Sequence, residues 1–137
     1  MQNRYLFKAK RIKDGQWVEG AFYIEPYTDC CYIIQWNSTG LGFNEFIEVD
    51  GETICQCTGL KDKNGNLIWE NDIVAYWDSY STESGLAEAD CIGKVVWDDE
   101  TISFQVTNRL SAESYEVLGD ECSVIGNVFD NPELLEE

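Results

Sequence analysis

Residues 60–69 read Leu-Lys-Asp-Lys-Asn-Gly-Asn-Leu-Ile-Trp, and this stretch carries the strongest turn signal in the chain. Asn64-Gly65 favours the tight turn of a β-hairpin, because both residues tolerate a positive φ. Leu60 on one side and Leu67-Ile68 on the other can close over the turn. The stretch therefore predicts two antiparallel strands joined at Asn64-Gly65.

Short strands and turns continue outward from this hairpin in both directions. Asp14-Gly15 is a second hairpin signal, which separates an alternating apolar and basic segment from the run Trp17–Ile24. Further runs rich in β-branched and aromatic residues recur along the chain. The predicted strands are residues 5–12, 17–24, 31–36, 46–49, 53–58, 73–77, 93–97, 102–106, 115–119 and 124–129.

Many short strands with no long helical pattern between them predict a mainly β fold, either a barrel or a sandwich. A length of 137 residues fits one domain, or two very small ones. Residues 78–90 are polar with little periodicity, which predicts an exposed, mobile loop. Near the end of the chain, Asn131, Pro132 and Glu133 form a helix-start pattern that predicts a short C-terminal helix.

The chain is strongly acidic, with nine Lys and Arg against 26 Asp and Glu and a net charge of −17. Such a field repels phosphate backbones and anionic membrane surfaces, so binding to nucleic acid or to a membrane is disfavoured. The basic stretch from Arg4 to Lys13 could still form one isolated basic patch. The sequence shows neither a secretory signal nor an apolar segment that could span a bilayer, and we expect a cytoplasmic protein.

Six cysteines and no histidine limit the chemistry that the chain can perform. The cysteines lack the Cys-x-x-Cys spacing of zinc sites, although Cys55 and Cys57 would share one face of a strand and leave a metal or redox role as an alternative. Small buried side chains are the favoured interpretation of the cysteines in a reducing compartment. Without histidine, Ser-His and Cys-His catalysis are excluded, and no phosphate-binding glycine pattern occurs. We expect no catalytic residue, no metal site and no cofactor, and hence no enzyme.

Acidic residues and tryptophans gather near two predicted turns. Paired carboxylates can perform acid–base chemistry or bind a hard cation, but chance proximity is the simpler interpretation in so acidic a chain. Tryptophans fill the core of a small β domain or stand exposed as anchors of an interface. The candidate binding residues are Trp69, Glu70, Asp72, Trp97, Asp98 and Asp99.

Three blocks of the sequence resemble the YopX family of phage and prophage proteins. The first block comprises residues 7–11 and 15–20, the second 58–65 and 69–74, and the third 124–135. Because the blocks lie at the start, middle and end, the resemblance covers nearly the whole chain.

The resemblance implies an origin in a bacteriophage or prophage. It also implies an N-terminal β region over residues 1–57 and a small SH3-like barrel over residues 58–137, but it supplies no mechanism and no functional residues. The family tends to place glycine before the sequence Asp-Ile-Val, where this chain has Asn71. Because Asn tolerates positive φ, we expect the same tight turn at Asn71.

The functional class that we favour is a non-catalytic protein-interaction module in the cytoplasm of a bacterial host. Its partner would be a phage or host protein, and edge strands would also allow a homo-oligomer. One alternative is an acidic DNA mimic that inhibits a host DNA-binding protein, with carboxylates in place of phosphates. The other is a nucleic-acid binder that uses the Arg4–Lys13 stretch, whose affinity would fall steeply with salt.

Overall fold

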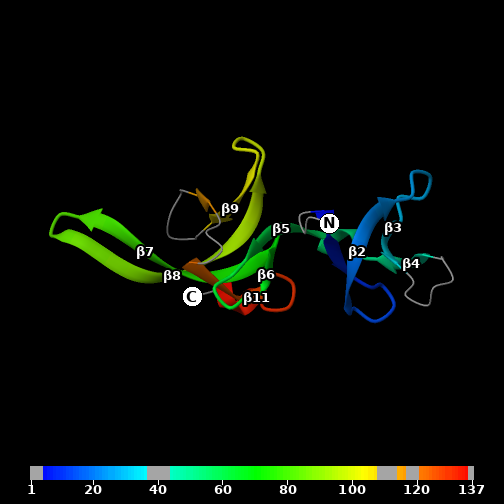
Figure 1. The fold of residues 1–137 in the computed structure, drawn as a ribbon, viewed down its shortest axis with the longest axis horizontal. Coiled ribbons are helices and arrows are strands. Elements are labelled where there is room, and N and C mark those ends of the chain that lie inside the picture. The colour runs from blue at the N-terminus through cyan, green and yellow to red at the C-terminus, as the bar shows by residue number, and fades with distance from the viewer. Residues whose placement is uncertain (1–4, 37–43, 108–113, 117–120, 136–137) are drawn as a thin grey trace. The chain divides into compact units, whose positions relative to one another are not determined.

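The computed structural model describes residues 5–36, 44–107, 114–116 and 121–135 and divides the chain into two compact units. The first unit is Met1–Gly59 and the second is Leu60–Glu137. The boundary predicted from the sequence, between residues 57 and 58, lies two residues earlier. The described elements are antiparallel strands and short 3-10 turns, which confirms the predicted mainly β fold (Figure 1).

The first unit is an antiparallel sheet whose strands follow the order β4-β3-β2-β1-β5. The hairpin predicted at Asp14-Gly15 is confirmed, because β1 and β2 pair from Phe7↔Gly20 to Lys10↔Trp17 and Gly15 has a φ of +72°. Strand β5 begins in this unit, and its last residues belong to the second one. The strands are β1 (Phe7–Lys10), β2 (Trp17–Ile24), β3 (Cys31–Trp36), β4 (Asn44–Val49) and β5 (Cys55–Lys61).

The sheet of the first unit curls until the end of β1 meets the end of β4. The Asp50 N–H donates to the Lys10 carbonyl at 2.9 Å, and the Ile12 N–H donates to the Glu48 carbonyl at 3.2 Å. This curl encloses a small apolar core on one face of the strands. Ala9, Ile33 and Val49 are buried there, and the side chains packed against them are Phe7, Val18, Cys31, Ile47 and Ile54.

The second unit contains a five-stranded antiparallel sheet of order β10-β9-β8-β7-β11. Among the residues that the structure describes, the edge strands β10 and β11 do not pair with each other. The sheet is therefore open, and the predicted SH3-like barrel is not confirmed. The elements of this unit are β6 (Leu67–Trp69), β7 (Asp72–Thr82), β8 (Gly85–Asp98), β9 (Ser103–Thr107), β10 (Ser114–Glu116), β11 (Cys122–Asn127) and the 3-10 turn η4 (Pro132–Leu135).

The hairpin at Asn64-Gly65 joins β5 to β6, as the sequence predicts. Gly65 has a φ of +86°, and its N–H donates to the Asp62 carbonyl at 3.0 Å. The core residues of the second unit follow this turn in the sequence. They come from alternating positions of its strands. The buried members of this core are Ile68, Val74, Val95, Val106 and Cys122, with Tyr76, Phe104 and Val124 packed against them.

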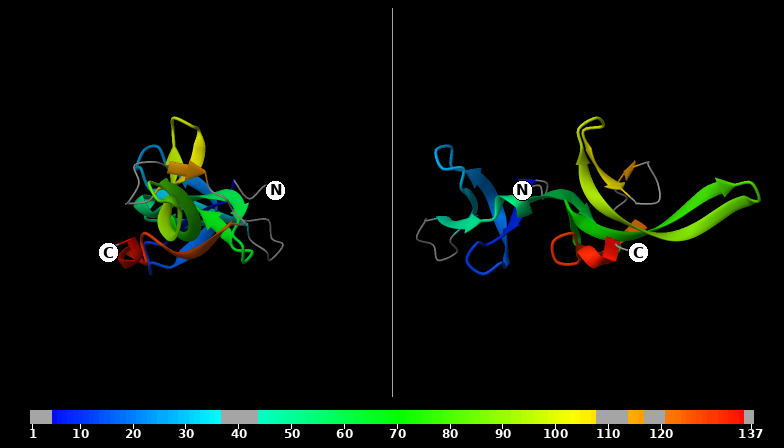
Figure 2. Two further views of the ribbon diagram at one scale, coloured as in Figure 1. Left: turned by 90° about the vertical axis from the view of Figure 1, so that its left-hand side faces the viewer. Right: turned by 180° about the vertical axis from the view of Figure 1, so that it is seen from behind.

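The prediction of a loop over residues 78–90 is wrong, because these residues complete β7 and β8. The two strands pair from Ile73↔Lys94 to Thr82↔Gly85, whereas β11 reaches only to Tyr76 and β9 only from Lys94 onward. The remaining residues of β7 and β8 form a two-stranded ribbon that extends beyond the other strands of their unit (Figures 1 and 2). Backbone hydrogen bonds between the two strands form the ribbon, and no hydrophobic period marks it in the sequence.

The predicted C-terminal helix is also wrong, since Pro132–Leu135 forms a single 3-10 turn. The Leu134 N–H donates to the Asn131 carbonyl at 3.1 Å, which is the three-residue spacing of a 3-10 helix. Before it, the Asn127 side chain accepts from the N–H groups of Phe129 and Asp130, at 3.0 and 2.9 Å. Such local side-chain bonds compete with α-helical hydrogen bonds.

Candidate functional site

Three of the six predicted site residues lie in the turn between β6 and β7 and serve the fold. Trp69 and Asp72 are buried, and Glu70 is half-buried. The Trp69 N–H donates to Asp72 Oδ2 at 2.8 Å. This carboxylate therefore closes the turn from inside, and it is not presented to a ligand.

Asn71 occupies the tip of the same turn with a φ of +70°, which confirms the positive φ expected there. Its N–H donates to the Val95 carbonyl at 2.8 Å, and its carbonyl accepts from the Val128 N–H at 3.0 Å. The turn is thus bonded to β8 and to the segment after β11. The backbone conformation of the turn therefore accounts for the residue types found in it.

The other three predicted residues lie where β8 leads into the turn before β9, and two of them are exposed. Trp97 Nε1 donates to Asp99 Oδ1 at 2.8 Å, and the Glu100 N–H donates to Asp98 Oδ1 at 2.9 Å. The Trp97 ring packs edge-to-face on Phe104 with centroids 5.1 Å apart. The hydrogen bonds join Trp69 with Asp72 and Trp97 with Asp99, each within its own turn.

Asp62 is a buried carboxylate that sequence reasoning missed, with 4% of its surface exposed. Its Oδ1 accepts from the N–H groups of Asn64 and Asn66 at 2.9 and 2.8 Å, and its Oδ2 accepts from the Val124 N–H at 2.9 Å. Burial alone would raise the pKa of Asp62, but these three donors outweigh it and lower the pKa. An Asp that opens an Asn-Gly turn was the available signal.

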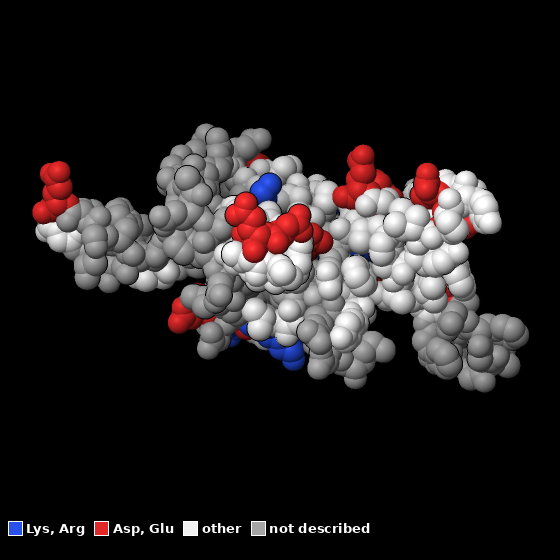
Figure 3. Space-filling model, turned by 90° about the horizontal axis from the view of Figure 1, so that it is seen from above, with Lys and Arg blue, Asp and Glu red and all other residues white. Residues whose placement is uncertain are grey.

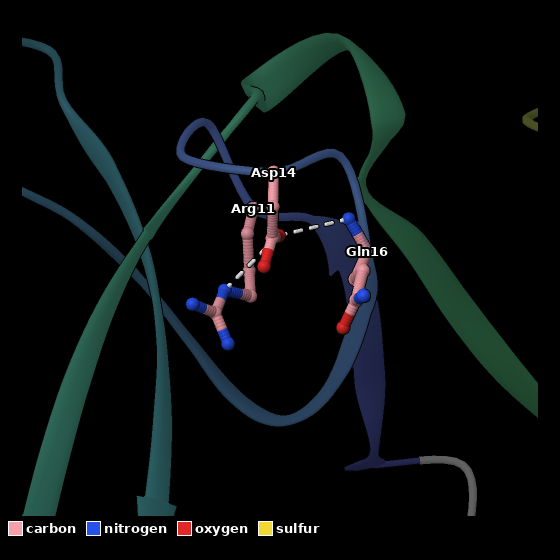
Figure 4. A network of polar contacts seen from close by, with 3 residues as sticks. All are labelled: Arg11, Asp14 and Gln16. Atoms are coloured by element: carbon pink, nitrogen blue, oxygen red, sulfur yellow. Dashed lines mark hydrogen bonds and ion pairs between the residues drawn. The ribbon is translucent and has the colours of Figure 1, made fainter.

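Arg4 of the predicted basic stretch lies outside the described residues, whereas Lys8, Lys10 and Arg11 contact their own neighbours. The ammonium groups of Lys8 and Lys10 lie 4.8 and 5.4 Å from the centroid of the Trp17 ring. Arg11 Nε lies 3.3 Å from Asp14 Oδ1, which also accepts from the Gln16 N–H at 3.1 Å (Figure 4). These contacts give the basic residues structural roles in the β1–β2 hairpin.

A cleft of about 630 Å³ opens beside this hairpin. Lys10 and Arg11 line it together with three acids, Asp29, Glu48 and Asp50. Its charges are therefore mixed, and it offers no concentrated positive field for a phosphate. The described residues contain no group of three or more His, Cys, Asp or Glu side chains that could hold a metal ion.

The most distinctive surface of the first unit is a contact cluster of three aromatic rings, which we call the aromatic triad: Tyr23 of β2, Tyr32 of β3 and Phe46 of β4. Each pair of ring centroids is 6.4 Å apart. Tyr32 is half-buried, whereas Tyr23 and Phe46 are 41% and 58% exposed. Soluble proteins seldom leave several large apolar side chains together in solvent without a use for them.

Strand register places the triad on the face opposite the core. Tyr23 lies directly opposite Tyr32, and Phe46 lies opposite Ile34, two residues further along β3. The buried Ile33 points to the other face, because successive side chains alternate. The sequence showed three apolar strands, but only the pairing register reveals that these rings meet.

The triad has an acidic border. Partial burial and then electrostatic interactions with Cys30 and Glu48 raise the pKa of Tyr32, and Glu25 adds to the same effect. Glu48 lies directly opposite Tyr32, on the same face as the rings. From residue 14 to residue 60 the sequence contains no Lys or Arg, so no basic side chain of β2, β3 or β4 balances this field.

The described part of the chain contains no helix long and apolar enough to cross a membrane. On the face drawn in Figure 3, acidic side chains stand out in several groups on the described surface.

Comparison with known proteins gives a family match and a structural match. The model of a protein family described as YopX protein matches residues 6–136. The crystal structure of protein EF1440 from Enterococcus faecalis is similar over 95% of this chain and 96% of its own, with 26% sequence identity and a TM-score of 0.53. No curated protein matches the chain.

Proposed function

This chain belongs to the YopX family, and on that premise we propose that it is a non-catalytic protein-interaction module. The observation that carries the proposal is the exposure of the aromatic triad on the open face of β2, β3 and β4. Aromatic side chains dominate the binding energy of many protein interfaces, because they bury large areas with little loss of side-chain freedom.

The chemistry of the described residues supports a binding role over catalysis. The chain has no histidine, and the buried carboxylates of Asp62 and Asp72 accept hydrogen bonds from backbone N–H groups. The donors around Asp62 lower the pKa of this carboxyl, which makes it a poor source of a proton for a substrate at neutral pH. In the cleft of the first unit, basic side chains line the same space as the acidic ones.

The proposal includes a setting, the cytoplasm of a bacterial host during phage growth or lysogeny. The resemblance to phage and prophage proteins supports this setting, and the structure similar to this chain comes from a bacterium. The partner would be a phage or host protein. The net charge of −17 favours a partner with a basic surface.

Affinity capture from host lysate tests the proposal when wild type is compared with a variant of the aromatic triad. Tagged wild-type protein, the double variant Tyr23→Ala/Phe46→Ala and the control Tyr27→Ala are compared after nuclease treatment. Tyr27 is 95% exposed and lies outside the triad, so its truncation removes an aromatic ring without touching the proposed site.

We expect at least one host or phage protein that wild type and Tyr27→Ala capture equally and that the double variant loses. Capture that is unaffected by the double variant would contradict the proposal. Capture of nucleic acid that nuclease removes would point instead to the basic N-terminal stretch, and a captured protein displaced by added DNA would favour a DNA mimic.

A further inference from the structure

We propose that the outer edge of β4 receives an extended basic segment of the partner, with a Lys or Arg side chain of that segment seated over the aromatic triad. The inference rests on the proposed function and names the chemistry of its partner. Three features of the first unit carry it: an open strand edge, exposed rings beside that edge, and carboxylates next to the rings.

The first feature is the direction of the backbone groups of β4. The Glu48 carbonyl accepts from the Ile12 N–H, so Glu48 presents its backbone away from β3. Backbone groups alternate sides along an antiparallel strand, and Phe46, two residues earlier, therefore presents its N–H and carbonyl to the same outer side. Among the described residues, pairing on that side is confined to the end of β4, at Glu48, Val49 and Asp50.

The second feature is the exposed aromatic rings that a strand added at this edge would contact. In an antiparallel pair, a side chain opposite Phe46 or diagonal to it lies within reach of the Phe46 ring. Phe46 is the most exposed member of the triad, at 58%, and its ring stands edge-on to both tyrosines. Addition of a strand gives affinity through main-chain hydrogen bonds and specificity through the side chains that face the neighbouring strand.

The third feature is the charge that surrounds the rings. A cation over an aromatic face is attracted by the ring quadrupole. Glu48 lies opposite Tyr32 on the same face of the sheet, and Glu25 also acts on Tyr32 electrostatically, so both add negative charge beside the rings. Residues 14–60 contain no Lys or Arg, and Lys10 and Arg11 contact this edge at its end, in the cleft that they line with Glu48 and Asp50. An acidic segment beside Phe46 would therefore be repelled by the carboxylates near the rings. A basic segment is therefore the matched occupant.

The test uses a short fluorescent peptide in which Arg and Val alternate, so that all Arg side chains face one side when it is extended. Its Kd for the full-length protein is measured by fluorescence anisotropy at physiological and at high salt. One control peptide has Ser in place of Arg. A second carries N-methyl groups on alternate peptide bonds, which blocks pairing at a strand edge.

Phe46→Leu is the decisive variant, because Leu keeps apolar bulk at this exposed position and removes the ring. We expect Phe46→Leu to weaken binding of the Arg peptide about three- to fivefold, which corresponds to the loss of one exposed cation–π contact. N-methylation should weaken binding about tenfold through lost backbone hydrogen bonds. Tyr27→Ala should bind like wild type.

Equal binding of the Ser and Arg peptides would overturn the basic-segment inference, yet it would leave the interaction module standing on its own capture experiment. Equal losses in Phe46→Leu and Tyr27→Ala, or no effect of N-methylation, would show diffuse charge attraction and overturn the site. The absence of any peptide binding would overturn the inference as well.

Discussion

Asp62 accepts hydrogen bonds from backbone groups in two separate parts of the second unit, the Asn64-Gly65 turn and strand β11. Hydrogen bonds to an ionised carboxylate are stronger than those between neutral groups. Removal of this one side chain would leave three backbone donors without their acceptor in a largely buried place. A single residue thus links the β5–β6 hairpin to the edge of the sheet.

Asp62→Ala should lower the free energy of unfolding by about 2–3 kcal/mol, the order expected when buried donors lose a charged acceptor. Urea denaturation at neutral pH measures the change. Asp98→Ala is the matched control, since Asp98 accepts from one backbone N–H in its turn, and it should cost less than half as much. Equal costs for the two variants would contradict the role given to Asp62.

The contribution of Asp62 should also depend on pH. Its pKa is lowered in the folded protein from the ordinary 3.8. The stabilisation is therefore fully present above the pKa of the unfolded chain and is lost as the pH falls through the folded pKa. The difference in unfolding free energy between wild type and Asp62→Ala should shrink below about pH 3.8, and a constant difference down to strongly acidic pH would contradict this assignment.

Asn71 provides a second prediction at the level of one residue. At its φ of +70°, a residue with a Cβ atom is disfavoured unless it is Asn or Asp. Asn71→Gly and Asn71→Ala both remove the amide, but only Gly fits the backbone without strain. Asn71→Gly should therefore be more stable to urea than Asn71→Ala by about 1 kcal/mol. Equal stabilities would show that the turn relaxes to another conformation.

At the scale of elements, the sequence predicted the two hairpin turns. It did not predict which side chains lie beside one another in the paired strands. Asp14-Gly15 and Asn64-Gly65 predicted both hairpins, because positive φ is a local property of Gly and Asn. The aromatic triad could not be found this way, since its rings come from three strands whose register is set by pairing. The ribbon of β7 and β8 was not predicted for a related reason. Its sequence is polar, and a polar strand shows no alternation of hydrophobic residues by which it could be recognised.

The ribbon gives a prediction of its own. The buried core residues that the structure identifies in the second unit lie outside residues 78–90. Replacement of residues 79–88 by Asn-Gly would keep the pair Asp78↔Ala89 and rebuild a short hairpin. The free energy of unfolding should change by less than about 1 kcal/mol in urea denaturation. A large loss of stability would show that the ribbon contributes to the core.

At the scale of the whole molecule, charge is the dominant feature. A net charge of −17 opposes compaction, because like charges approach one another as the chain folds. Moderate salt screens this repulsion. The free energy of unfolding in urea should rise by on the order of 1 kcal/mol from low to physiological sodium chloride. An uncharged osmolyte at matched osmolality is the control, and an unchanged value in salt would contradict the argument.

Photocrosslinking in living cells tests most directly whether the aromatic triad is a protein-binding surface. A photoreactive phenylalanine analogue replaces Phe46 in one strain and Tyr27 in another, and the bacterial host is illuminated while the protein is expressed. The account predicts a discrete covalent adduct with a protein from position 46 and none from position 27. No protein adduct at position 46, or the same adducts from both positions, would contradict it.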